Sequence, residues 1–435
     1  MLPILADQNA LIGEIPSLES ALTGSPVFRR MTPSVLKTRP LTGSARLFEF
    51  IPHAFPMISS AESKRQQLLP TLLSARNFAV EQALRTLRDY PGYLPMYTVN
   101  GKWNREGERW THWCEGFFPG ILWLLHKSTG IDAFRSPAEE LSRKLEPRRF
   151  DRNVHDLGFL FFSTYLRWYR LTKEPALREI ILDAGRTLAL RREKGGYLKS
   201  FIGPESLFID IMMNVGIILW TANETGEKVL REIALEHCRT TRRTIVRPDG
   251  STAHEGIFDL DTGQFLRETT HQGYGANSAW TRGLTWAIYG FTAVYRLSGE
   301  KEFLDTARRC ADYYLRRAAG TGMVPHWDFD IPEDGPRLWD SSAGAIAASG
   351  LWDLSEAVED EAAKEKYQLA ALTALETLCS DQFLARSRPE WEGILLHGVY
   401  HYHKNLGVDE SVAWGEHFFV EALVKAIAGK SEAGW

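Results

Sequence analysis

Ile217-Ile218-Leu219-Trp220, followed closely by the turn Glu224-Thr225-Gly226, is the stretch that decides the fold. The first run is apolar on every side, whereas the helical pattern at 227–244 combines an apolar stripe with a charged outer face. A helix that is apolar all round must be buried, and an amphipathic helix can cover it from outside. A short turn between two such helices predicts a hairpin with one inner and one outer member.

The same arrangement recurs along the chain. Comparable turns follow aromatic-rich segments at Ser128-Thr129-Gly130, Leu171-Thr172-Lys173 and Leu297-Ser298-Gly299. Apolar periodicity predicts twelve helices, at 68–89, 117–128, 137–145, 156–171, 175–192, 206–223, 227–244, 277–297, 302–317, 341–357, 362–384 and 411–428. Six hairpins of this kind would close into an all-α (α/α)6 barrel. An open helical solenoid is the alternative, but solenoids have more even spacing and capping repeats, so closure is favoured.

Composition restricts the partners and the compartment. Of the 435 residues 44% are hydrophobic, and Lys+Arg 51 against Asp+Glu 55 leaves a net charge of -4 with no basic run. Nucleic acid and anionic membranes are therefore unexpected partners. The four cysteines, Cys114, Cys238, Cys310 and Cys379, lack the CxxC spacing of zinc sites, which favours a reducing compartment. Composition says nothing about the oligomeric state.

The N-terminal region differs from the rest. Residues 1–65 are rich in Pro, Ser and Thr with weak periodicity, which predicts an extension or arm, and 66–435 are expected to form one catalytic domain. The first residues lack the basic start and apolar core of a secretory signal, and no apolar run reaches membrane-spanning length. We therefore expect a soluble, cytoplasmic protein.

Two aspartates stand at the start of apolar stretches. Asp156 lies in His155-Asp156-Leu157-Gly158-Phe159, and Asp210 lies in Phe208-Ile209-Asp210-Ile211-Met212-Met213-Asn214. A buried carboxylate is costly unless something pairs with it or uses it. Each could simply cap a helix, because acidic residues are common in the first turn. Two such residues together with aromatic and His-rich segments favour an active site built on paired carboxylates.

The unusual residues gather in the predicted connections between hairpins. These are Gly101–Asn104 with Trp110–Trp113, Asp249–Glu255 with Thr270–Tyr274, Pro325–Asp330, and His397–Lys404. In an α/α barrel such loops meet at one end and form a cleft. Aromatic faces with polar groups between them suit sugar rings, although many of the 14 tryptophans could equally be core residues.

Other chemistries fit poorly. The sequence has no GxxxxGK[ST] loop, GxSxG elbow or HExxH pair, so no cofactor or metal is expected. His401 and His403 could suggest a metal, but they lack an acidic or Cys complement. A structural or substrate-facing role is favoured for both.

At this point the chain resembles the unsaturated glucuronyl hydrolases of glycoside hydrolase family 88. The motifs that carry the resemblance, between about Trp110 and Ala428, are the two aspartate runs, Gln272-Gly273-Tyr274, Ser278–Gly283 with Trp286–Phe291, Trp327–Asp330, and Asp340–Ala343. The Asp210–Asn214 run is more similar to this family than to the related unsaturated rhamnogalacturonyl hydrolases. The resemblance implies an (α/α)6 barrel, in agreement with the helix count.

The resemblance also implies a chemistry. Family members act on oligosaccharides made by polysaccharide lyases, whose terminal uronic acid carries a C4=C5 double bond. Protonation at C4 and addition of water at C5 give a hemiketal that opens and expels the aglycone. Asp210 matches the general acid/base and Asp156 its partner, while His254, Gln272, Arg282 and Trp286 match substrate-binding positions, joined by Trp110 and His155. The side chain of Arg282 suits the uronate carboxylate.

Two departures and two alternatives accompany this resemblance. Cys114 stands where the family usually has an aromatic residue, so the resemblance does not identify the residue that supplies the aromatic wall for stacking the sugar. The Tyr400–Lys404 loop lies where some members recognise sulfate, and here Lys404 remains without the accompanying serines. The parent polysaccharide is therefore not determined. An unsaturated rhamnogalacturonyl-type hydrolase and a non-catalytic carbohydrate-binding toroid are the alternative functions, and retention of both aspartates argues against the second.

Overall fold

The computed structural model describes residues 59–104 and 112–431, within a compact unit formed by Met57–Trp435. Helix α1, Ser60–Asp89, begins earlier than the predicted 68, because Ser59 accepts a hydrogen bond from the Glu62 amide at 3.1 Å and caps it. The predicted arm at 1–65 falls mostly outside the described residues, so its boundary stays a prediction. Trp110 also lies outside them.

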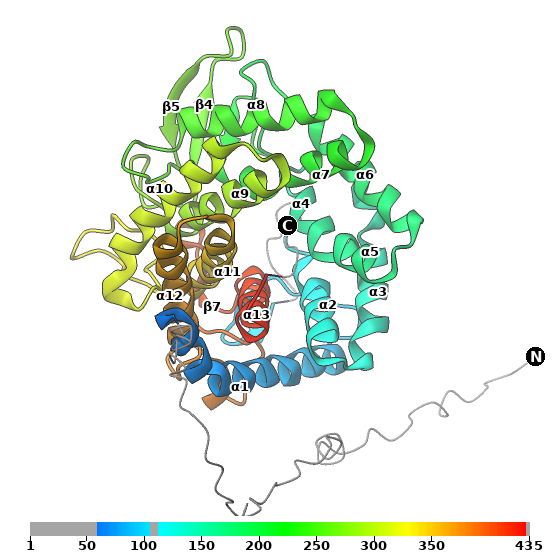
Figure 1. Ribbon diagram of the computed structural model, residues 1–435, viewed down its shortest axis with the longest axis vertical. Coiled ribbons are helices and arrows are strands. Elements are labelled where there is room, and N and C mark those ends of the chain that lie inside the picture. Colours follow the sequence, from blue (N-terminus) through cyan, green and yellow to red (C-terminus); the bar gives the residue numbers. More distant parts are fainter. Residues whose placement is uncertain (1–58, 105–111, 432–435) are drawn as a thin grey trace, which may run out of the picture. The chain divides into compact units, whose positions relative to one another are not determined.

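Within this unit the helices form two concentric layers (Figure 1). The inner helices are α2 Phe117–Thr129, α4 Leu157–Phe161 continued through a π turn into α5 Arg167–Thr172, α7 Gly216–Thr225, α9 Thr281–Ser298, α11 Ser341–Ala357 and α13 Ala413–Ala428. The outer helices are α3 Arg135–Lys144, α6 Pro175–Ala189, α8 Lys228–Thr244, α10 Lys301–Ala318, α12 Glu361–Leu378 and α1. Because α13 packs against both α11 and α2, the inner ring is closed. The (α/α)6 prediction is confirmed and the open solenoid is excluded.

The recurring turns end the inner helices for a backbone reason. Gly130, Gly226 and Gly299 follow α2, α7 and α9 with left-handed φ values of 73°, 77° and 76°. This conformation lets the turn's amide bond back to a helical carbonyl, and it strains a residue with a Cβ. Lys173 adopts it after α5 at φ 59°. The turn pattern in the sequence therefore marks real helix ends.

One predicted helix was wrong in its first half. Residues 206–223 split into strand β3 Ser206–Phe208, a 3₁₀ turn at Ile209–Met213, and α7 from Gly216. Ser206–Phe208 pairs antiparallel with β4 Glu255–Phe258, which in turn pairs with β5 Phe265–Thr269. These long-range hydrogen bonds override the local periodicity. Asp210 consequently sits in a turn between a strand and a helix.

Two further short hairpins occupy the connections between helices. They are β1 Thr98–Val99 with β2 Lys102–Trp103, and β6 Gly398–His401 with β7 Leu406–Glu410. The predicted helix at 362–384 ends at Leu378 instead. None of the described helices combines the length and the apolar character needed to cross a bilayer.

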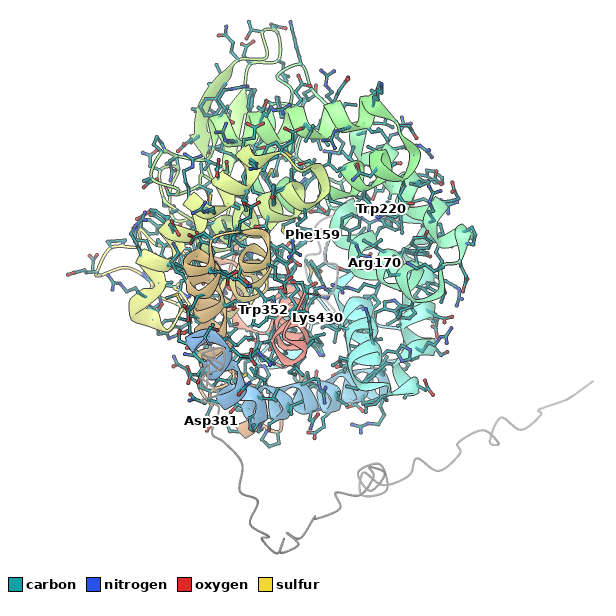
Figure 2. All side chains as sticks on the ribbon, viewed as in Figure 1. Phe159, Arg170, Trp220, Trp352, Asp381 and Lys430 are labelled. Carbon is teal, nitrogen blue, oxygen red and sulfur yellow. The ribbon has the colours of Figure 1, made fainter. Side chains whose placement is uncertain are left out.

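The barrel interior is rich in aromatic side chains. Phe159, near the centre of the ring in Figure 2, is fully buried and lies with its ring centroid 5.3 Å from Phe117, 5.1 Å from Trp286 and 5.5 Å from Trp113. Aromatic pairs at such spacings add to the energy of area burial. Many of the tryptophans are therefore core residues, as the plainer interpretation of the sequence held.

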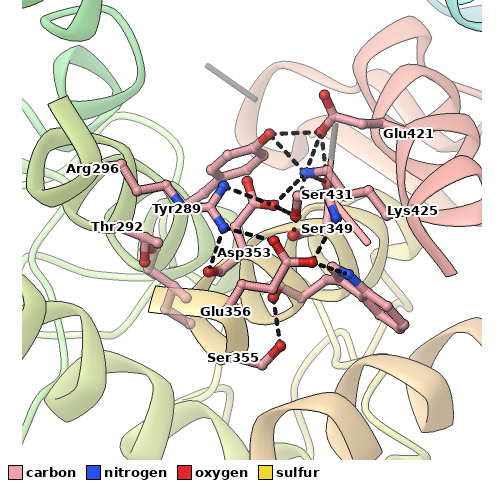
Figure 3. Close-up of polar contacts among 12 residues, drawn as sticks. Tyr289, Thr292, Arg296, Ser349, Asp353, Ser355, Glu356, Glu421, Lys425 and Ser431 are labelled. Carbon is pink, nitrogen blue, oxygen red and sulfur yellow. Dashed lines mark hydrogen bonds and ion pairs between the residues drawn. The ribbon is translucent and has the colours of Figure 1, made fainter. Parts of the chain in front are cut away.

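A buried charged network also joins the inner helices (Figure 3). The Lys425 ammonium lies 3.0 Å from the Asp353 carboxylate and 3.2 Å from that of Glu421, and all three side chains are almost fully buried. Glu421 also accepts hydrogen bonds from Tyr289 at 2.7 Å and Ser349 at 2.6 Å. Since these residues come from α9, α11 and α13, the network links three neighbouring inner helices.

Candidate active site

The connections at one end of the barrel enclose a pocket of about 370 Å³. It is lined by Trp113, His155, Asp156, Phe201, Ile202, Phe208, Asp210, His271, Gln272, Arg282, Tyr400, His401 and Lys404. The predicted connections around Trp113, Thr270–Tyr274 and His397–Lys404 do meet in this pocket. Pro325–Asp330 instead lines a separate pocket with Arg317 and Arg337, so the prediction of one common cleft was wrong for that loop. The lining of the first pocket combines apolar rings with titratable groups, the combination expected of a sugar site.

Asp156 precedes α4 but does not cap it. Its side chain makes no capping hydrogen bond and is only 4% exposed. The Nε2 atom of His155 lies 3.3 Å from its Oδ1. Because His155 Nδ1 accepts the Phe201 amide at 3.1 Å, the neutral ring carries its proton on Nε2, which faces Asp156. Burial, helped by the negative charge of Asp210, raises the pKa of Asp156 to about 8.

Asp210 offers a less engaged oxygen to the pocket. Its Oδ2 is buried and has no hydrogen-bond partner among the described residues. The Nε2 atom of His254 lies 3.8 Å from it, and burial lowers the pKa of His254 so that its ring is neutral. His254 Nδ1 accepts the amides of His271 at 3.0 Å and Gln272 at 3.3 Å, so its Nε2 carries the proton and faces the carboxyl. Burial raises the pKa of Asp210 to about 6, against the lowering effect of Arg282.

Asn214 and Gly158 hold the two aspartate segments together. The side-chain carbonyl of Asn214 accepts the Phe159 amide at 2.8 Å, and its amide donates to the Asp210 carbonyl at 3.1 Å. A Cβ on Gly158 would lie 2.6 Å from the Asn214 Cα. Only glycine permits this approach. The local sequence around each aspartate thus encodes their juxtaposition.

The two carboxyls act as a coupled pair. Because each ionised group disfavours ionisation of the other and both are buried, the pair keeps one proton between pH values of about 6 and about 8. Such a pair can donate a proton to a substrate and then accept one from water.

Neither aspartate side chain makes a capping hydrogen bond, so the capping interpretation of the sequence was wrong for both.

Arg282 lines the pocket but is largely engaged by the protein. Its Nη1 donates to the Val399 carbonyl and lies 3.5 Å from Asp340, and its Nη2 donates to the Tyr400 carbonyl at 2.9 Å. The guanidinium lies 4.5 Å from the Trp280 ring centroid and is 1% exposed. A full bidentate grip on a uronate would compete with these bonds. Its pairing with a uronate therefore stays a prediction, while its charge already acts on Asp210.

Three other predicted contacts are placed as follows. Gln272 lines the pocket and donates to the Tyr400 carbonyl at 2.9 Å, which ties it to the β6–β7 hairpin. His254 stands behind Asp210, outside the lining. The structure does not bear out the expectation for Trp286, because this residue is fully buried against Phe159 and does not line the pocket.

The β6–β7 hairpin brings Tyr400, His401 and Lys404 to the pocket. Tyr400 accepts a hydrogen bond from Trp113 at 3.4 Å, and burial raises the pKa of its hydroxyl. His403 turns away and contacts the Gly273 carbonyl at 2.8 Å. His401 therefore faces the pocket, while His403 makes a structural contact.

Several lining residues were missing from the predicted set. Trp113 supplies an aromatic wall next to the buried Cys114, with its ring centroid 4.8 Å from that of Trp414. The cysteine therefore does not remove the wall. Phe201 and Ile202 form another side of the pocket, and Ile202 is 46% exposed. An apolar pair between Ser200 and Gly203-Pro204 in a loop was the signal that could have revealed it.

Comparisons with known proteins agree with this geometry. The model of Glycosyl Hydrolase Family 88 matches residues 95–390. An unsaturated glucuronyl hydrolase of Bacillus sp. (strain GL1) is 34% identical over 331 residues, covering 73% of this chain and 87% of its own length. An unsaturated chondroitin disaccharide hydrolase of Streptococcus pyogenes serotype M1 is 32% identical over 325 residues, covering 72% and 81%.

A solved structure extends the likeness to three dimensions. The crystal structure of unsaturated glucuronyl hydrolase from Bacillus sp. GL1 superposes with a TM-score of 0.76 at 30% identity, covering 82% of this chain and 97% of that chain. The fold and the paired carboxylates already define a carbohydrate-active toroid. With the family match, the chain belongs to glycoside hydrolase family 88.

Proposed function

We propose that this enzyme removes the 4,5-unsaturated glucuronic acid from the non-reducing end of lyase-generated oligosaccharides by hydrating its C4=C5 bond. The observation that carries the proposal is the buried pair Asp156 and Asp210, which keeps one proton near neutral pH inside an aromatic-walled pocket. The names of the relatives at 34% and 32% identity support the same substrate class. An intact carboxylate pair argues against a non-catalytic binding toroid.

The first step is a proton transfer. The carboxyl of Asp210 donates its proton to C4, and the electron pair of the double bond forms the new C–H bond. This leaves a cation at C5 that the ring oxygen stabilises. Burial raises the pKa of Asp210 to about 6, so a larger fraction of this acid is protonated near neutral pH than of an ordinary aspartate. Asp156 lies beside His155 and has the higher pKa of the two carboxyls, so near neutral pH it holds the shared proton while Asp210 is ionised, and the active fraction is the one in which the proton is on Asp210.

The second step is the addition of water. The Asp210 carboxylate takes a proton from a water molecule as its oxygen bonds to C5. The hemiketal then opens to a ketone at C5, and the hemiacetal at C1 releases the aglycone. No bond from an enzyme nucleophile to C1 is needed, so carboxylate spacing carries no stereochemical prediction here. The Nε2–H of His254 faces Asp210 at 3.8 Å and is, among the described residues, the group nearest at hand to donate to its carboxylate between the steps.

Turnover of an unsaturated disaccharide tests the function. Loss of the ultraviolet absorbance of the conjugated uronate reports the reaction, and a panel of glucuronyl and galacturonyl-rhamnose products separates it from the unsaturated rhamnogalacturonyl-type activity. In D₂O the product should carry deuterium at C4 at early times. Finished product incubated in D₂O without enzyme controls for exchange. A turned-over product lacking C4 deuterium would rule out hydration.

The cellular location is part of the proposal. We infer a cytoplasmic enzyme, supported by four free, buried cysteines. A reducing compartment keeps thiols in this state. Fractionation of the native cells with detection of the protein tests the assignment.

A further inference from the structure

Arg191 is a buried arginine just behind the pocket, at the end of α6. Its side chain holds three backbone carbonyls: Nε donates to Lys199 at 2.8 Å, Nη2 to Ser200 at 2.5 Å, and Nη1 to Arg152. The residue is 4% exposed. A buried guanidinium that makes several directed hydrogen bonds fixes the groups it touches.

The carbonyls that Arg191 holds belong to two segments of the active site. Arg152 lies shortly before His155 and Asp156, and Ser200 directly precedes Phe201 and Ile202 of the pocket wall. The His155 ring accepts the Phe201 amide, so the two segments are also joined on the pocket side. Arg191 joins the same two segments a second time, through its hydrogen bonds to the Arg152 and Ser200 carbonyls.

The charge of Arg191 has no counterion in direct contact. Among the described residues no carboxylate lies within ion-pair distance of its guanidinium, and the three hydrogen bonds described above all go to carbonyls. Burial accordingly lowers its own pKa, which the charge of Asp156 opposes. A buried and unpaired charge is costly, so its retention calls for a use.

The groups that face Asp156 show what the charge does. The charged and titratable groups around this carboxyl are His155, Asp210 on the 3₁₀ turn, Arg191 after α6, Arg148 and Asp151 around the preceding 3₁₀ segment, and Tyr400 on β6. Arg148 is already paired with Glu115 and Asp151, each at 3.0 Å. Arg191 is therefore the cation beside Asp156 that lacks a carboxylate of its own, and it opposes the rise in the pKa of Asp156.

We propose that Arg191 is a positioning residue of the active site, which locks the Asp156 segment to the Phe201–Ile202 wall and holds a fixed positive charge behind the carboxylate pair. The inference rests on the proposed hydration reaction. It assigns two separable roles to a side chain outside the pocket lining: hydrogen bonds that fix the backbone, and a positive charge that acts on Asp156.

Two substitutions separate the roles. Arg191→Gln keeps an N–H donor for the carbonyls and loses the charge, so the alkaline limb of kcat/KM should move up by roughly one pH unit, because the Asp156 proton is then held more tightly. Arg191→Lys keeps the charge and loses the fork. Its alkaline limb should stay at the wild-type pH while kcat falls about tenfold or more through misplacement.

Arg192→Gln is the matched control. Arg192 is the next residue, lies on the surface and pairs with Glu236 at 2.9 Å. Its loss should change neither the rate nor the pH profile. A residue that served the fold alone would lower the rate of both Arg191 variants at every pH and leave the limb in place, which would overturn the proposal. Failure of both variants to fold would overturn it as well, by making Arg191 a folding residue.

A titration without substrate distinguishes this test from the test of the function. The infrared band of the protonated Asp156 carboxyl, assigned by its absence in Asp156→Asn, is followed against pH in wild type and both variants. If the enzyme acts on a different glycoside, the titration of Arg191→Gln should still move to higher pH. An unmoved band in a folded Arg191→Gln protein overturns the charge assignment whatever the substrate is.

Discussion

Gly158→Ala should separate the two aspartates while leaving the barrel folded. The new Cβ would lie 2.6 Å from the Asn214 Cα and 2.9 Å from its carbonyl oxygen, about 0.8 Å inside the 3.4 Å at which ordinary contact begins. Backbone atoms cannot rotate away, so the start of α4 and the turn that carries Asp210 must move apart by nearly an ångström. A misplacement of that size costs about 10²-fold in rate. Overpacking should cost a further 1–3 kcal/mol or so of stability.

The assay is kcat and KM on an unsaturated disaccharide, with the melting temperature measured on the same protein. Gly320→Ala is the control, because a Cβ at that glycine meets nothing within 4 Å and its backbone is not left-handed. We expect the control to match wild type in rate, and Gly158→Ala to lose mainly kcat. A folded Gly158→Ala enzyme with wild-type kcat would refute the claim that this contact positions the carboxylates.

Three further perturbations follow from the structure. Asp210→Asn should lower kcat by about 10²–10⁴ with the fold retained, and Asp156→Asn should also be severe; near-normal turnover by a folded Asp210→Asn protein would end the assignment. The pH profile of kcat/KM should be bell-shaped, falling below about 6 as the pair takes a second proton and above about 8 as it loses its last one, and a flat profile across this range would contradict the shared proton. Lys425→Met should reduce the free energy of unfolding, measured in urea, by up to about 3–5 kcal/mol, because it removes the buried cation between Glu421 and Asp353 and leaves them only Arg167 and Arg296, whereas an unchanged midpoint would show that the network is dispensable.

The helices could be predicted because their pattern is local. An apolar run such as Ile217–Trp220 and a left-handed turn residue such as Gly226 each act within a few residues, and together they locate a hairpin. The segment before Asp210 could not be predicted in this way. Its Leu207 is apolar in a helical period, yet it pairs with Gly256, some fifty positions later, and that register is not visible in the local sequence.

The same distinction applies to the site. Asp156 and Asp210 could be found because a carboxylate at the start of an apolar run conflicts with burial, and such conflicts mark functional positions. Arg282 was recognised as important, but its engagement by the Val399 and Tyr400 carbonyls depends on a hairpin more than a hundred positions away. Trp286 was expected to bind substrate because it matches a substrate-binding position in the resemblance to the family, and only the packing shows that it is fully buried against Phe159.

The barrel contains two buried clusters of ionisable groups, one around Lys425 and one at the pocket, and the cost of burying charge is met differently in each. Around Lys425 every charge meets an opposite charge, and the pKa of Glu421 is held below its usual value by Lys425 and Arg167, against the effect of burial. At the pocket the carboxyls meet neutral histidines and each other, so burial prevails and both pKa values rise. Charge pairing gives the first cluster a structural role that weakens only when acid protonates Glu421. Within the described part of the chain, the carboxyls of the pocket lack a directly paired cation, so burial disfavours their ionised forms and the pair retains a proton that it can transfer to a substrate.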